Sequence, residues 1–277
     1  MDKLRFGTAG IPLSTPGKAT MLDGIKHVRT LGLDVMEMEF VRGVHVSDEK
    51  APLVKEMAQK NDVLLTCHGQ YYVNLNAHDP AILRASVQRM LDASRAAWKT
   101  GAWSICYHMA YYMKDDTETV YQRVKKQARD VVRQFREEGN TIWLRPETGG
   151  KVNQFADVDD LIRLSQDVEQ VLPCIDWAHQ CARSNGKVNS YNTFKTILEK
   201  IEKGLGREAL ENMHMHIEGI AYSEKGEKHH LNFSQSDFRY AELMKLWKDF
   251  KIKGAAICES PSIESDALIA RDTYVKS

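Results

Sequence analysis

Short apolar runs alternate along the whole chain with longer segments in which apolar residues recur every three or four positions. Eight of the short runs have the length and composition of buried strands, namely residues 4–7, 35–40, 63–68, 103–108, 141–147, 172–176, 213–217 and 255–259. The longer segments, such as 20–31, 81–99, 117–138 and 236–250, carry charges on their other face and are predicted to be amphipathic helices. Alternating strands and helices indicate a parallel sheet with helices packed outside it.

The number of strand–helix units favours a closed barrel. Eight units within 277 residues match the size of a (β/α)8 barrel. No linker rich in Pro, Gly or Ser divides the chain, so one domain over residues 1–277 is expected. The alternative is an open doubly wound sheet, which normally has a glycine-rich turn after its first strand. The GxGxxA string at 204–209 follows a predicted helix instead. The predicted fold is a single α/β domain, a (β/α)8 TIM barrel.

Composition narrows the environment and the partners. The chain has 38 basic and 38 acidic side chains, so only a local patch could attract nucleic acid. No apolar stretch reaches about 18 residues and no leader pattern opens the chain, which predicts a cytoplasmic protein without a membrane partner. Five cysteines form no CxxC pair and are expected to be reduced. There is no complete P-loop, so no nucleotide cofactor is expected.

Metal-ligating residue types stand at the ends of six consecutive predicted strands. Reactive groups of a (β/α)8 barrel lie at the carboxyl ends of its strands, so these side chains should share one rim. One histidine follows three positions after the sixth strand, and the segment after the seventh adds two more candidates. The full set is His68, His108, Glu147, Asp176, His179, His216, Glu227, His229 and Glu259.

This ligand set predicts a multinuclear metal centre at the rim. Imidazole and carboxylate groups suit Zn²⁺, with Mn²⁺ or iron as alternatives in some positions. Nine ligands exceed the needs of one ion, whereas two or three ions sharing a carboxylate would use them all and could activate water against a phosphoryl group. Three divalent ions, four carboxylates and one hydroxide leave a net charge of about +1, which favours an anionic substrate. Structural roles are expected for the remaining histidines, His27, His45, His78, His214 and His230, and for Cys106 and Cys174.

Over essentially its whole length the chain resembles endonuclease IV, a family of zinc-dependent apurinic/apyrimidinic endonucleases in the xylose-isomerase-like barrel superfamily. The matching strings are RFGTAG (5–10), CHGQYYVNL (67–75), YH (107–108), PETGGK (146–151), CIDWAHQCA (174–182), MHMHI (213–217), EKHH (227–230) and CESP (258–261). The most specific of them are CIDxxH and the tyrosine three residues after His68.

The resemblance implies three zinc ions and a DNA repair activity. His68, His108 and Glu147 would hold the first ion, Glu147 with Asp176, His216 and Glu259 the second, and His179, Glu227 and His229 the third. A hydroxide bridging the ions, positioned by Glu147 as the catalytic residue, would attack the phosphorus 5′ to an abasic site in double-stranded DNA. Tyr71 would insert at the lesion, with Asn74, Lys151 and Arg42 as further DNA contacts, and the protein is expected to be a monomer.

Two alternatives stay open at this point. The family commonly has Asp where Glu227 stands, and one extra methylene shifts the carboxylate by about 1.5 Å, so the third site is expected to be altered. A chain that lost this site could bind damaged DNA without cleaving it. Sugar isomerases and epimerases of the same superfamily need one ion only, held by the counterparts of Glu147, Asp176, His216 and Glu259. The five additional ligands favour the nuclease.

Overall fold

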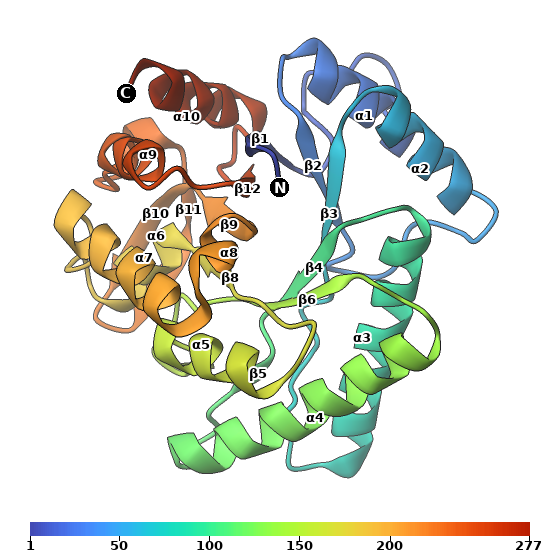
Figure 1. Cartoon of the computed structure of the whole chain (residues 1–277), viewed down its shortest axis with the longest axis vertical. Coiled ribbons are helices and arrows are strands. Elements are labelled where there is room, and N and C mark those ends of the chain that lie inside the picture. The colour runs from blue at the N-terminus through green and yellow to red at the C-terminus, as the bar shows by residue number, and fades with distance from the viewer.

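A ring of parallel strands surrounded by helices forms the molecule (Figure 1), which is a computed structural model describing residues 1–277. The eight strands of the main sheet lie in the order β6-β4-β3-β2-β1-β12-β9-β8. Backbone bridges join Leu144 to Val171 and Glu147 to Cys174, so the two outer strands meet and the barrel is nearly closed. The predicted TIM barrel is confirmed. The strands are β1 Leu4–Ala9, β2 Val35–Glu39, β3 Leu64–His68, β4 Ser104–Tyr107, β6 Trp143–Pro146, β8 Cys174–Asp176, β9 Met213–Ile217 and β12 Gly254–Cys258.

The helices form the outer ring, and most of them begin at a capping side chain. Asp79, Asp116, Asp157 and Ser190 each accept a hydrogen bond from a backbone N–H of the first turn that would otherwise lack a partner. None of the helices is both long and apolar enough to cross a bilayer. They are α1 Met21–Thr30, α2 Ala51–Lys60, α3 Pro80–Lys99, α4 Thr117–Glu137, α5 Val158–Asp167, α6 Trp177–Arg183, α7 Tyr191–Leu205, α8 Arg207–Leu210, α9 Tyr240–Asp249 and α10 Glu264–Lys276.

Two differences from the predicted elements have clear local causes. The helix expected over 236–250 begins only at Tyr240, because Phe233–Gln235 forms a separate 3-10 turn and the chain is irregular up to Arg239. The strand expected over 172–176 is reduced to Cys174–Asp176. Pro173 precedes it and has no N–H to donate to a neighbouring strand.

Two short antiparallel pairs extend from the carboxyl end of the barrel. β10 (Gly219–Ser223) and β11 (Gly226–Leu231) form a hairpin directly after β9, and β5 (Ala110–Tyr111) pairs with β7 (Gln154–Phe155). In the hairpin, Ala221 lies opposite His229 but Tyr222 lies opposite Glu227, so Lys228 is an unpaired extra residue, a β-bulge.

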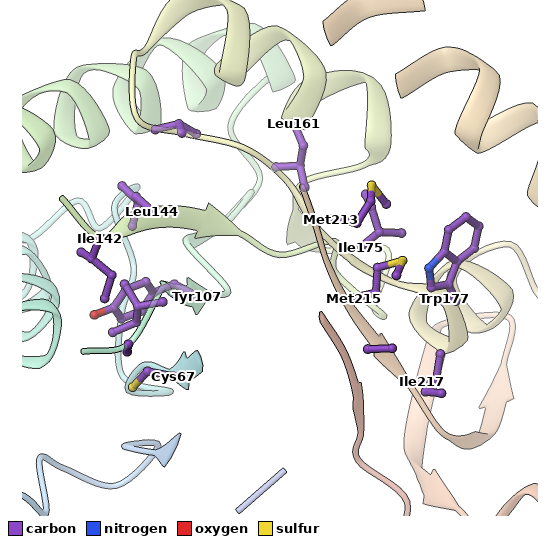
Figure 2. Close-up of a cluster of buried hydrophobic side chains, with 14 of the residues drawn as sticks. Cys67, Tyr107, Ile142, Leu144, Leu161, Ile175, Trp177, Met213, Met215 and Ile217 are labelled. Atoms are coloured by element: carbon purple, nitrogen blue, oxygen red, sulfur yellow. The ribbon is translucent and has the colours of Figure 1, made fainter. Parts of the chain in front are cut away.

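Side chains of the barrel strands alternate between an apolar outer face and a polar interior. In β9, Met213, Met215 and Ile217 project toward the helices, where Trp177 of α6 is also buried (Figure 2). The intervening His214 and His216 are fully buried inside the barrel. The period of two therefore places the outer positions in the apolar core and the inner ones toward the candidate site.

Candidate metal centre

Ends of the barrel strands bring the candidate ligands together at one rim, around Glu147. His68 is the last residue of β3, and His108 and Glu147 directly follow β4 and β6. One carboxylate oxygen of Glu147, Oε2, lies 3.2 Å from His68 Nε2 and 3.4 Å from His108 Nε2. The other, Oε1, lies 3.1 Å from His216 Nδ1 and 3.5 Å from His179 Nδ1. Glu147 is thus shared between two groups of imidazoles.

The first two groups have the spacing of metal ligands. His68, His108 and Glu147 each place one ligand atom within 4.8 Å of the others, and a second set with this property is Glu147, Asp176, His216 and Glu259. Two ligands bound to one tetrahedral zinc ion at about 2.05 Å are about 3.3 Å apart. The separations of 3.1–3.4 Å between Glu147 and His68, His108 and His216 bracket this value, so these groups need little movement to hold an ion.

A third group lies between α6 and the hairpin that follows β9. His179 Nε2 is 3.5 Å from Glu227 Oε2, and His230 Nε2 is 3.8 Å from Glu227 Oε1. Glu218, the residue between β9 and β10, lies 4.0 Å from His230 through Oε1. His179, Glu218 and His230 also place their ligand atoms within 4.8 Å of one another.

The expectation for His229 is not met by this geometry. His229 is exposed on the hairpin and His230 lies at the centre in its place. Glu227 and His229 would share a face in a regular strand, because side chains alternate with a period of two. The bulge at Lys228 shifts this alternation by one residue, so that Glu227 and His230 face the centre together.

Hydrogen bonds to the second ring nitrogen leave the metal-facing nitrogen free. His68 Nδ1 donates to the Gly69 carbonyl at 2.8 Å, and His179 Nδ1 donates to the Thr148 carbonyl at 3.0 Å. His216 presents Nδ1 to Glu147, while its Nε2 lies 2.9 Å from Glu37 Oε1. Partners of this kind fix the tautomer and orientation of metal-binding histidines.

Burial and mutual repulsion shift the titration of the carboxyl groups. Burial alone would raise the pKa of Glu147, but the imidazoles of His108 and His216 lower this pKa well below its usual range. Burial, opposed by His179, raises the pKa of Asp176 to about 6. Burial also raises the pKa of Glu39 to about 8, with His68 acting against it, and that of Glu218 well above its ordinary value. Burial therefore dominates at Asp176, Glu39 and Glu218, whereas the neighbouring imidazoles dominate at Glu147.

Orphaned polar atoms provide a direct test of whether a metal would fit. Both oxygens of Glu218 and Oε1 of Glu39 are buried without a hydrogen-bond partner. Groups of this kind need a proton or a cation, since removing an unpaired carboxylate from water is strongly unfavourable. Divalent ions with a preference for nitrogen and oxygen ligands fit this set.

A cavity of about 230 Å³ opens above the centre. Five of the predicted metal ligands line it, together with Tyr71, Lys151 and His230. The complete lining is His68, Tyr71, His108, Tyr111, Lys151, Gln154, His179, Glu227, His230 and Glu259. Of the expected DNA contacts, Tyr71 and Lys151 therefore lie at the mouth. Asn74 faces the loops, accepting hydrogen bonds from the backbone of Asn76 and Tyr111, and the exposed Arg42 does not line the cavity.

Four residues of the centre were missed by sequence reasoning: Glu37, Glu39, Glu218 and His230. The sequence pattern could have indicated Glu37 and Glu39, because the two carboxylates alternate with methionines in β2. In a closed barrel one face of each strand packs against the helices and the other faces the interior, so alternate residues point inward. The strict alternation of side chains along a strand places His230 on the face opposite Glu227 and so predicts a structural role for it. Nothing in the sequence marks the bulge at Lys228, which brings His230 to the same face as Glu227.

Comparisons with known proteins agree on the fold and divide on the chemistry. A family model described as xylose isomerase-like TIM barrel matches residues 25–275. "Uncharacterized protein MJ0133" of Methanocaldococcus jannaschii is 38% identical over 271 residues, covering 98% of this chain and 97% of that protein. Endonuclease IV from Thermus thermophilus superposes with a TM-score of 0.73 at 18% identity, over 98% of this chain and 100% of that one.

Epimerases are similar in structure as well. A D-tagatose 3-epimerase-like protein superposes with a TM-score of 0.72 at 15% identity, covering 98% of this chain and 96% of its own. D-psicose 3-epimerase, solved in the presence of D-fructose, superposes with a TM-score of 0.65 at 17% identity, over 98% of both chains. At such low identities the likeness establishes the barrel and leaves the reaction to be argued from the site.

Proposed function

Because the chain belongs to the family of xylose isomerase-like TIM barrels, which spans different chemistries, we propose a specific member activity from the site itself. The protein is a zinc-dependent DNA repair endonuclease that hydrolyses the phosphodiester on the 5′ side of an abasic site in double-stranded DNA. The number and arrangement of ligands around Glu147 carry this proposal.

More than one ion is needed to account for these side chains. Glu147 belongs to two groups of ligands, and a third group contains His179, Glu218 and His230. One ion held by Glu147, Asp176, His216 and Glu259 would leave His68, His108 and Glu227 buried or half-buried around the same cavity without a role. Several zinc ions supply Lewis-acid stabilisation of both the attacking and the leaving oxygen of a phosphodiester, together with an acidified water.

The chain's own residues suit an anionic sugar–phosphate. Lys151 lies at the cavity mouth, where its ammonium group can attract a phosphate. The cavity of about 230 Å³ is smaller than usual pockets for drug-sized ligands, about 300–1,000 Å³. It therefore suits one sugar–phosphate unit better than a complete nucleotide. Extruding an abasic unit costs little, because no base pair has to be broken.

Exposed apolar side chains are frequent in the loops at the carboxyl ends of the strands, and one of them, Tyr71, lines the cavity. Of nine large apolar side chains that are exposed, five lie in loops that follow β1, β3, β5 or β6, namely Leu13, Tyr71, Tyr72, Met113 and Val152. Tyr71 is 56% exposed and its ring lies 5.7 Å from that of His68. Aromatic and apolar groups in this position can stack on unpaired bases or fill the gap left by a missing one.

A single-metal sugar epimerase is the second candidate, supported by the structural likeness to D-psicose and D-tagatose epimerases. Under this alternative, only Glu147, Asp176, His216 and Glu259 would hold an ion, and the substrate would be a small carbohydrate. A protein that binds damaged DNA without cleaving it is the remaining alternative.

The deciding experiment uses an end-labelled duplex with one tetrahydrofuran abasic analogue, and the same duplex without the lesion. We expect chelator-sensitive nicking 5′ to the lesion, restored by zinc, and nicking at least about 100-fold slower by Glu147→Gln purified in parallel. Glu224→Gln, which removes an exposed carboxylate of the β10–β11 turn, is the matched control and should nick normally. Absence of nicking by zinc-loaded wild type, with turnover of D-psicose or D-tagatose, would establish the epimerase instead. Tight lesion binding without nicking would establish the non-catalytic alternative.

A further inference from the structure

Glu218 is a buried carboxylate with no partner in the folded chain. It connects β9 to β10, it is completely buried, and both of its oxygens lack a hydrogen bond. No lysine or arginine forms an ion pair with it, and the nearest ionic contact is His230 Nε2 at 4.0 Å. A charged group in this state is strongly destabilising unless a cation lies beside it.

The surroundings of Glu218 have the composition of a metal site. His179, Glu218 and His230 direct ligand atoms to within 4.8 Å of one another. Glu227 lies beside these three residues, with Oε2 3.5 Å from His179 Nε2 and Oε1 3.8 Å from His230 Nε2. Two imidazoles and two carboxylates form an N2O2 set that would neutralise a divalent cation and satisfy tetrahedral zinc.

The backbone fixes this group in place. Glu227 N donates to the Gly150 carbonyl at 2.9 Å, and Gly226 forms a bridge with Lys151, so β11 is attached to the loop after β6. A Cβ atom at Gly150 would lie 2.7 Å from both Glu227 Oε2 and His179 Cδ2. Only glycine allows the loop to approach so closely. The bulge at Lys228 then directs His230, and not His229, toward Glu218.

We infer that Glu218 is a ligand of the third metal ion, together with His179, Glu227 and His230, and that His229 is not. This inference rests on the proposed multinuclear centre and adds to it a carboxylate that the resemblance to endonuclease IV does not provide. Glu227 is one methylene longer than the aspartate common at this position in endonuclease IV. The bulge at Lys228 places the Glu227 carboxylate beside His230, so the longer side chain still faces the site.

Metal content of matched variants tests the inference. Full-length protein is stripped with chelator, loaded with zinc, dialysed against a zinc buffer and analysed by mass spectrometry for zinc per chain. Wild type, His229→Ala and Glu224→Gln should retain about three zinc ions, whereas Glu218→Gln and His230→Ala should retain about two. The affinity for the ion that is lost should fall by at least about tenfold.

Thermal unfolding gives a readout that does not depend on activity and reports on folding. In chelator, Glu218→Gln should melt higher than wild type, because burying a neutral amide costs less than burying a carboxyl group that is ionised in the unfolded chain. In zinc, the order should reverse, because wild type alone gains the third ion. Circular dichroism before heating identifies any variant that fails to fold.

Two results would overturn the inference: Glu218→Gln that binds zinc as wild type does, or His229→Ala that loses one ion. If wild type nicks abasic DNA and Glu218→Gln keeps three ions, the third-site assignment fails while the proposed function stands. If the variants lose the ion as expected and wild type does not nick, the site assignment stands and the nuclease fails.

Discussion

Replacing Glu37 tests whether the layer beneath the metal centre holds His216 in position. The carboxylate of Glu37 is fully buried, and its two oxygens each lie 2.9 Å from an imidazole nitrogen, one on His214 and one on His216. His214 Nδ1 in turn lies 3.0 Å from the hydroxyl of Ser104. Burial alone would raise the pKa of Glu37, but these two histidines lower it well below its usual range, so the group is ionised.

The cost of two substitutions follows from these contacts. Glu37→Ala leaves two buried imidazole N–H groups without an acceptor, at about 1–3 kcal/mol each, and should destabilise the metal-free protein by about 3–5 kcal/mol. Glu37→Gln can keep both contacts. Its oxygen accepts from His216 and its amide donates to His214, which then donates to Ser104 through the other nitrogen. Because only the charge is lost, Glu37→Gln should lower the free energy of unfolding by about 1 kcal/mol.

Urea unfolding of the metal-free proteins measures this difference, and zinc competition measures the effect on the ion that His216 would hold. Glu37→Ala should weaken binding of that ion by about 10–100-fold, because Glu37 orients the imidazole, and Glu37→Gln, which keeps the contact to His216, should weaken it less. This role of Glu37 is excluded if the free energy of unfolding of Glu37→Ala lies within about 1 kcal/mol of that of wild type, or if Glu37→Gln destabilises the protein as much as Glu37→Ala does.

Three further predictions address catalysis, DNA contact and pH. Glu147→Gln should lower nicking at least about 100-fold with an unchanged circular dichroism spectrum, and wild-type rates would contradict the shared-ligand role. Tyr71→Ala should weaken binding of the abasic duplex by about 1–3 kcal/mol, measured by fluorescence anisotropy, with unchanged zinc content; equal affinity would exclude stacking. In the metal-free protein, burial raises the pKa of Glu39 to about 8, so the folded chain holds this proton more tightly than the unfolded chain. The stabilisation is complete below about pH 4.5 and is lost as the pH rises toward 8, by at most about 1.4 kcal/mol per pH unit. Urea unfolding from pH 5 to 8 should show a steeper loss of stability in wild type than in Glu39→Gln, where only the other buried carboxyl groups contribute, and equal slopes would contradict the prediction.

The barrel and most of the rim could be predicted because both depend on simple periodicities. Strands such as Met213–Ile217 alternate large apolar residues with polar ones, and the barrel rule then places their ends at a common rim. That is why the sequence predicts that His68, Glu147 and Asp176 meet, although they lie far apart along the chain. That Glu147 is the carboxylate shared between them is implied by the resemblance to endonuclease IV and does not follow from the strand pattern.

The remaining ligands depend on local irregularities that leave little trace in the sequence. His230 and His229 are adjacent histidines, and the bulge at Lys228 decides between them. Glu218 lies one residue beyond a strand, at a turn into a hairpin that the pattern did not predict. Glu37 and Glu39 alternate with apolar residues, a pattern that is also typical of a half-exposed strand with one charged face. Only in the closed barrel does that face lie in the interior.

The most direct test of the multinuclear centre is a zinc titration of the metal-free chain, with bound zinc and nicking of the abasic duplex measured at every step. We expect nicking to reach its maximum only when about three zinc ions are bound per chain. Binding that saturates at about one ion per chain, with no nicking at any zinc concentration, would contradict it.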